Sequence, residues 1–102
     1  MQKNSNGYIP HPLQTDVTLP DEVLSAVDQI ARQVHEMWAI TKMRGGYVFG
    51  KVTDDRARTH KDLRPYEELT EESKSYDRET ALMTLRILYA LGYEIRKKNP
   101  DA

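Results

Sequence analysis

Length, composition and charge restrict this chain to a small set of protein classes. Its 102 residues are 38% hydrophobic and 30% charged, and 15 Lys and Arg against 16 Asp and Glu give a net charge of -1. This composition is typical of one globular domain and lies outside the range of disordered chains. The near-zero net charge gives no general argument for nucleic-acid or membrane binding. The absence of cysteine excludes disulfides and thiolate sites.

The N-terminal part of the chain is predicted to be an extended arm followed by a helix. Residues 1–7 are polar, and three prolines up to residue 20 favour an extended course. Apolar residues then recur at helical spacing, which predicts one long amphipathic helix over about residues 20–43. Gly45 and Gly46 are expected to end it.

A short aromatic segment follows the first predicted helix. Residues 47–49 are aromatic or β-branched and lie between two glycines, a pattern that predicts a short strand. Residues 93–95 alternate in polarity and are predicted to be the strand that pairs with it. Residues 51–64 have no periodicity and are predicted to form a loop, and residues 65–69 a single turn.

A second amphipathic helix is predicted over about residues 70–91. Thr70 is a good N-cap residue, and two glutamates follow it in the first turn. Leucines at helical spacing up to Leu91 provide an apolar stripe, and Gly92 is expected to end the helix.

These elements define a mainly α fold with two principal amphipathic helices, an extended N-terminal arm and a small β element. We expect one domain over residues 8–96, with a flexible N-terminus and a frayed tail at residues 97–102.

The motifs of common catalytic and cofactor sites are absent from the sequence. It contains no P-loop, no Gly-x-Gly-x-x-Gly, no His-Glu-x-x-His and no Gly-x-Ser-x-Gly. His11, His35 and His60 stand 24 and 25 residues apart, unlike the short spacings of metal ligands. Adjacent acids at Asp54 and Asp55 are more typical of a solvated turn than of a catalytic pair. We therefore expect no enzyme, no metal and no cofactor.

Two local clusters are candidates for a binding site. His35 and Trp38 are three residues apart on the first predicted helix, so their rings can meet on one face, either in a packed core or at a pocket wall. Residues 44–50 combine backbone N–H groups and aromatic faces with Arg44. That combination suits a planar ring and an anion, but it can equally build a tight turn.

Charge is distributed unevenly between the centre of the chain and the second helix. Residues 42–64 contain seven basic and three acidic residues, whereas residues 67–79 contain six acidic and two basic ones. The two segments can pair with each other, or the basic one can bind phosphate or carboxylate through bidentate arginine contacts. Residues 56–59, Arg-Ala-Arg-Thr, also match a basic motif for phosphorylation of Thr59.

Short motifs follow one another in order along almost the whole chain, from about Tyr8 to Ile95. They are Tyr8-x-Pro10-x-Pro12, Leu19-Pro20, Val34-His35-x-x-Trp38-Ala39, Arg44-x-Gly46-Tyr47-x-Phe49-Gly50, Asp54-Asp55, His60-x-x-Leu63-x-Pro65-Tyr66-Glu67-Glu68-Leu69, Tyr76-Asp77-Arg78-x-Thr80 and Leu88-x-Ala90-Leu91-Gly92-Tyr93. In this order they resemble the RyR domain, a module repeated in ryanodine receptors and also found in microbial proteins.

Two positions depart from that family's usual pattern. The family usually has Trp-x-Tyr-Gly where this chain has Tyr47-Val48-Phe49-Gly50, which keeps aromatic stacking but changes the hydrogen-bonding groups. A proline commonly follows the histidine of the central loop, whereas Lys61 follows His60 here and adds a positive charge.

The resemblance implies helices with a small β element, and a binding or regulatory module. It does not imply ion conduction, which needs membrane spans that this chain lacks. RyR-like modules of microbial proteins have been proposed to sense nucleotide-derived ligands. A copy of this kind is expected in a microbial or phage protein.

These observations predict a non-enzymatic binding or sensor module in the cytoplasm, with a small anionic or nucleotide-derived ligand. The alternative is a protein–protein interaction or self-assembly module, including a homo-oligomer; neither nucleic acid nor a membrane is expected as a partner. The residues predicted to form the ligand site are His35, Trp38, Arg44, Gly46, Tyr47, Phe49, His60, Arg64, Tyr66, Asp77 and Arg78.

Overall fold

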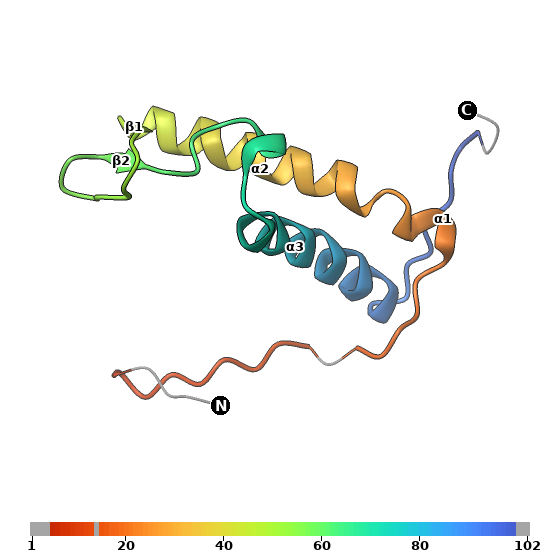
Figure 1. Ribbon diagram of the computed structural model, residues 1–102. Coiled ribbons are helices and arrows are strands. Elements are labelled where there is room, and N and C mark those ends of the chain that lie inside the picture. The colour runs from red at the N-terminus through yellow and green to blue at the C-terminus, as the bar shows by residue number, and fades with distance from the viewer. Residues whose placement is uncertain (1–4, 14, 100–102) are drawn as a thin grey trace.

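The computed structural model of the protein describes residues 5–13 and 15–99. The elements in chain order are α1 (Asp21–Leu24), α2 (Val27–Arg44), β1 (Val48–Phe49), β2 (Thr59–His60), the 3-10 turn η1 (Tyr66–Glu68) and α3 (Glu71–Ala90). Helices α2 and α3 run side by side in opposite directions, with the small sheet beyond one end of the pair (Figure 1). The predicted mainly α fold class is confirmed. The predictions for residues 1–4 and 100–102 lie outside the described ranges.

The first predicted helix, residues 20–43, is interrupted in the structure by a turn at Ser25 and Ala26. The Ser25 hydroxyl donates to the Glu22 carbonyl (2.8 Å), and the Ala26 N–H donates to the Val23 carbonyl (3.0 Å), three residues back rather than four. A serine side chain that bonds the backbone competes with the regular helical hydrogen bonds. The prediction of one continuous helix was therefore wrong at this turn.

Both long helices end in the same glycine-dependent motif, as predicted. Gly46 after α2 and Gly92 after α3 have φ angles of 88° and 98°. The N–H groups of Tyr47 and Tyr93 donate to the carbonyl five residues earlier (3.1 and 3.0 Å). This hydrogen bond at the helix end requires a residue in the left-handed conformation just after the helix. Glycine adopts that conformation without steric cost, because it has no Cβ atom.

The small β element pairs two segments other than the predicted ones. β1 lies parallel to β2, whereas residues 93–95 belong to no strand. The N–H of Ile95 instead donates to the Tyr89 hydroxyl (3.2 Å), and its side chain packs against the core. The predicted partner of residues 47–49 was wrong, because a pattern of two or three residues does not specify strand pairing.

Strand β2 lies within residues 51–64, which were predicted to be loop throughout. The connection folds back sharply because Asp54 and Thr59 exchange two backbone hydrogen bonds, each 3.0 Å long. Gly50 allows the close approach, since a Cβ at this position would stand 2.6 Å from the Cβ of Thr59.

Helix α3 is continuous and begins at the predicted N-cap. The Thr70 hydroxyl oxygen accepts a hydrogen bond from the Ser73 N–H (3.1 Å). Ala81 and Leu85 of the predicted apolar stripe are buried, whereas Leu91 lies beyond the helix end and is exposed. None of the helices in the described ranges combines the length and apolar character needed to cross a membrane.

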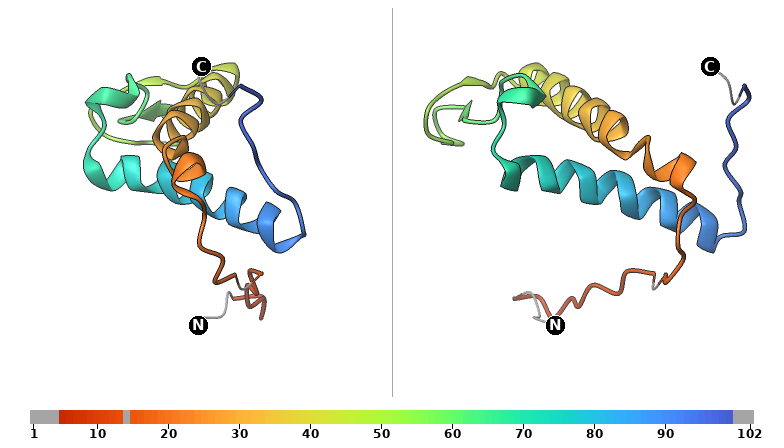
Figure 2. Two further views of the ribbon diagram at one scale, coloured as in Figure 1. Left: turned by 90° about the vertical axis from the view of Figure 1, so that its right-hand side faces the viewer. Right: turned by 45° about the vertical axis from the view of Figure 1, so that its right-hand side comes forward.

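The buried core is small and divided. One cluster contains Leu19, Val23 and Leu85, and the other contains Ala31, Tyr66 and Leu69. The N-terminal arm runs apart from the helix pair, and the loop between β1 and β2 extends beyond it (Figure 2). The radius of gyration is accordingly 16.8 Å, against about 13 Å for a compact domain of this length.

Thr70→Ala is expected to lower the free energy of unfolding by about 1 kcal/mol, because the Ser73 N–H loses its acceptor. Urea denaturation followed by circular dichroism measures the change. The matched variant Thr70→Ser keeps the hydroxyl and should stay close to the wild type; equal loss in both variants would contradict a capping role.

Candidate functional site

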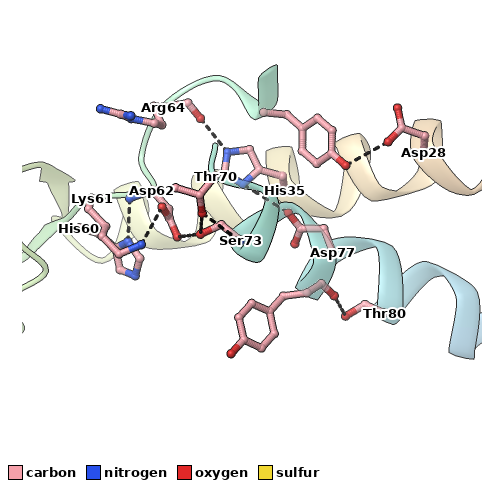
Figure 3. Close-up of polar contacts among 12 residues, drawn as sticks. Asp28, His35, His60, Lys61, Asp62, Arg64, Thr70, Ser73, Asp77 and Thr80 are labelled. Carbon is pink, nitrogen blue, oxygen red and sulfur yellow. Dashed lines mark hydrogen bonds and ion pairs between the residues drawn. The ribbon is translucent and has the colours of Figure 1, made fainter. Parts of the chain in front are cut away.

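A pocket of about 440 Å³ lies between α2, α3 and the segment that connects β2 to η1. This volume is within the range of small-molecule sites in proteins. Figure 3 shows the polar contacts around it. The lining residues are His35, Trp38, His60, Lys61, Asp62, Leu69, Glu72, Ser73, Tyr76 and Asp77.

His35 connects the three parts of the chain that surround this first pocket. Its ring is buried, and Nε2 lies 2.7 Å from the Arg64 carbonyl oxygen. Because a carbonyl only accepts, Nε2 carries the hydrogen and donates it. The other ring nitrogen, Nδ1, faces the carboxylate of Asp77 at 3.8 Å. The histidine thereby ties α2 to the central segment and to α3.

The indole of Trp38 lies between two imidazole rings. It stacks on His35 with ring centres 5.5 Å apart and meets His60 edge-on at 4.7 Å. Nδ1 of His60 accepts the backbone N–H of Asp62 (3.1 Å), so Nε2 carries the hydrogen in the neutral ring. Burial lowers the pKa of His60 below its ordinary value of 6.5, and the ring is a neutral donor at pH 7.

Three carboxylates make the first pocket acidic. Asp62 accepts hydrogen bonds from Lys61 Nζ (3.2 Å) and from the Ser73 hydroxyl (3.0 Å). Asp77 is only 17% exposed, and burial raises the pKa of its carboxyl, with the nearby His35 acting in the opposite direction. Glu72 completes the set, and Lys61 is the lysine among the lining residues.

A second pocket of about 220 Å³ adjoins the first and has the opposite charge. The two share Lys61, Asp62 and Leu69, and the second adds Phe49, Lys51, Arg64 and Thr70. The Arg64 guanidinium lies over the Phe49 ring, 5.1 Å from its centre. Three basic side chains and the N-cap residue of α3 thus surround a space beside the acidic pocket.

The structure brings together part of the predicted ligand site. His35, Trp38, His60 and Asp77 line the first pocket, and Phe49 and Arg64 line the second.

Tyr66 and Arg78 line neither pocket and belong to a separate network at Asp28. The Tyr66 hydroxyl donates to Asp28 Oδ1 (3.1 Å), and Arg78 Nε donates to the same oxygen (3.3 Å). The Arg78 guanidinium also donates to Glu71 (3.2 Å). The hydrogen bonds from Tyr66 and Arg78 lower the pKa of Asp28.

Arg44 is the last residue of α2, and Gly46 and Tyr47 follow it in the turn; these three residues line neither pocket. The Tyr47 hydroxyl donates to Asp55 (2.8 Å), and this hydrogen bond raises the pKa of Tyr47. The Arg58 guanidinium donates to the Gly45 carbonyl and packs against Gly46. These contacts fit the tight-turn interpretation of this segment.

The ion pairs of the described residues do not join the basic segment 42–64 to the acidic segment 67–79. Glu67 pairs with Arg32, and Glu71 pairs with Lys74 and Arg78. Internal pairing between the two segments therefore does not account for the basic charge around the second pocket.

The hydroxyl of Thr59, in the basic motif at residues 56–59, already forms a hydrogen bond within the protein. It donates to the Val52 carbonyl (2.9 Å), and the side chain rests against Gly50. A phosphate on this hydroxyl would break that hydrogen bond.

Within the described part of the chain, no group of three or more His, Cys, Asp or Glu side chains is arranged to hold a metal ion.

The first two turns of α3 contribute residues to the pocket that the sequence did not predict. Glu72, Ser73 and Tyr76 line it beside the predicted Asp77. The cap at Thr70 predicted where this helix begins, but only the packing of α3 on α2 shows which of its faces borders the pocket.

The family model of the RyR domain matches residues 8–97 of this chain. The chain belongs to the RyR domain family, as the ordered sequence motifs predicted. The match covers both long helices, the small sheet and all residues of the two pockets.

Acid is expected to destabilise the protein partly through His60. Its pKa is lower in the folded than in the unfolded chain, so below about pH 6.5 the unfolded state binds more protons. The contribution of neutral His60 to the free energy of unfolding is present above that pH, and it is lost as the pH falls through the pKa of His60 in the folded protein. An NMR titration should give a His60 midpoint below 6.5. Urea denaturation at pH 7.5 and 5.5 should show a smaller acid loss in His60→Gln, and a midpoint at or above 6.5 would contradict this account.

Proposed function

We propose that this RyR domain is a non-enzymatic binding module for a small anionic, nucleotide-derived ligand, and that it acts in the cytoplasm. The observation that carries the proposal is the pair of adjoining pockets, one walled by aromatic and imidazole rings and the other basic. A cytoplasmic location is compatible with the absence of cysteine.

The basic pocket supports an anionic group on the ligand. Lys51 and Arg64 form no ion pair with a carboxylate among the described residues, so their charges are not already neutralised. The Arg64 guanidinium lies over the Phe49 ring, and its N–H groups donate to no other described residue. A guanidinium is a planar fork of N–H donors that matches phosphate or carboxylate oxygens.

The larger pocket supports a planar group on the same ligand. Trp38 and Tyr76 provide aromatic surface at its wall, and Tyr76 is strongly exposed. A space of about 440 Å³ next to one of about 220 Å³ suits a ring and its charged substituent.

Binding without chemistry is supported by the hydrogen bonds of the polar groups. The Ser73 hydroxyl donates to Asp62 rather than to a histidine, and His35 Nε2 donates to a main-chain carbonyl. An activated nucleophile requires a base within hydrogen-bond reach of the hydroxyl. The acceptor of the Ser73 hydroxyl, the Asp62 carboxylate, is held in an ion pair with Lys61, and no imidazole of the described residues accepts from this hydroxyl.

A thermal-shift screen against nucleoside mono-, di- and cyclic phosphates tests the proposal. A ligand at 100 times its Kd stabilises the folded state by about 2.7 kcal/mol. For a domain of this size that raises Tm by roughly 10 °C or more. No stabilisation at millimolar concentrations of any of these compounds would overturn the proposal.

Arg64→Gln and Lys51→Gln are each expected to weaken binding of the best nucleotide about tenfold, because each removes a charge-assisted contact to the anion. Titration calorimetry at two salt concentrations measures the loss. Arg56→Gln is the matched control, since it makes the same charge change in the same segment outside both pockets. Equal affinities in all three variants would contradict an anion site here.

Exposed apolar side chains favour a second candidate function, self-assembly. Met37 and Met43 of α2, Val48 of β1 and Val52 of the adjoining loop are each at least 60% exposed. Light scattering tests this alternative. A monomer at several hundred micromolar would count against self-assembly, whereas a dimer dispersed by Met37→Glu would support it.

A further inference from the structure

We propose that Asp77 determines ligand specificity, by accepting a hydrogen bond from an amino group on the planar ring of the ligand. The inference rests on the proposed function and defines the chemical class of ligand: an amino-bearing base joined to an anionic group. It arises from the state of the Asp77 carboxylate inside the larger pocket.

The Asp77 carboxylate lacks a hydrogen-bond donor among the described residues. Its neighbour His35 donates from Nε2 to the Arg64 carbonyl, so in the neutral ring the nitrogen that faces Asp77 carries only a lone pair. The separation of 3.8 Å from Nδ1 to Oδ2 also exceeds a hydrogen bond. Asp77 therefore faces the His35 ring without accepting a hydrogen bond from it.

This state distinguishes Asp77 from the other carboxylates that the central network contains. Asp62 is satisfied by Lys61 and Ser73, and Asp28 is satisfied by Tyr66 and Arg78. The Asp77 carboxylate is 17% exposed, lines the pocket and accepts no hydrogen bond from a described residue, so it is partly desolvated and still lacks a donor from the protein. A ligand N–H at the pocket surface would supply that donor.

The position of Asp77 determines which end of the ligand it can contact. It lies on α3 at the wall of the acidic pocket, whereas Lys51 and Arg64 border the basic pocket, and Asp62 lines both pockets. A ligand that spans both spaces therefore has its anion at the basic pocket and an N–H donor at the acidic one. Amino-bearing nucleotides have this polarity.

Comparing the affinities of three purine nucleotides distinguishes recognition of an amino group from binding of the anion alone. Inosine monophosphate differs from guanosine monophosphate by lacking the amino group, and from adenosine monophosphate by carrying an oxygen in its place. The better of the two amino-bearing nucleotides is expected to bind at least about tenfold more tightly than inosine monophosphate, measured by titration calorimetry.

Asp77→Ala removes the acceptor and should reduce this preference to less than about threefold, while affinity for inosine monophosphate changes little. Glu79→Ala is the matched control, because it makes the same substitution at an exposed position of the same helix outside both pockets. Thermal melts verify that both variants fold. If Asp77→Ala does not fold, the comparison of the three nucleotides on the wild-type protein still tests the inference.

The outcomes are distinguishable. Equal wild-type affinities for all three nucleotides, or a preference that persists in folded Asp77→Ala, would overturn the role of Asp77 and leave the anion site intact. Binding of none of them, together with no stabilisation in the nucleotide screen, would overturn the proposed function itself. A preference that disappears in Asp77→Ala and persists in Glu79→Ala supports the inference.

Discussion

The hydrogen bond from His35 Nε2 to the Arg64 carbonyl holds together the parts of this molecule that form its pockets. The donor lies in the middle of α2, and the acceptor lies in the segment between β2 and η1. On its other side the ring faces Asp77 of α3. A buried imidazole needs a partner for its N–H, and a buried carbonyl needs a donor. One contact satisfies both and places the central segment over the space between the helices.

The two pockets differ in charge because different segments line them. The first turns of α3 bring carboxylates to one pocket, and the segment around β2 brings basic side chains to the other. Lys61 and Asp62 form an ion pair at the boundary that the pockets share. An overall net charge of -1 therefore conceals two opposite local environments in adjoining pockets.

Much of the fold could be predicted from local sequence signals. The N-cap at Thr70 and the glycines after α2 and α3 act over one helical turn, so their chemistry is visible in the sequence. The break at Ser25 was less visible, because serine occurs both inside helices and at turns. The partner of β1 could not be predicted, because strands of two residues carry too little pattern to define a register.

The sequence by itself determined the helical character of the chain, its helix ends, its family and the nearness of His35 to Trp38, because these depend on residues within a few positions or on ordered motifs. Only the tertiary structure decided that Asp77 and His60 join that pair. It also decided that Tyr66 and Arg78 bond to Asp28, and that Arg44 and Tyr47 stay at the end of α2, away from the pockets. These assignments depend on how α3 and the central segment pack on α2. Packing joins residues far apart in the chain, and spacing along the sequence does not record it.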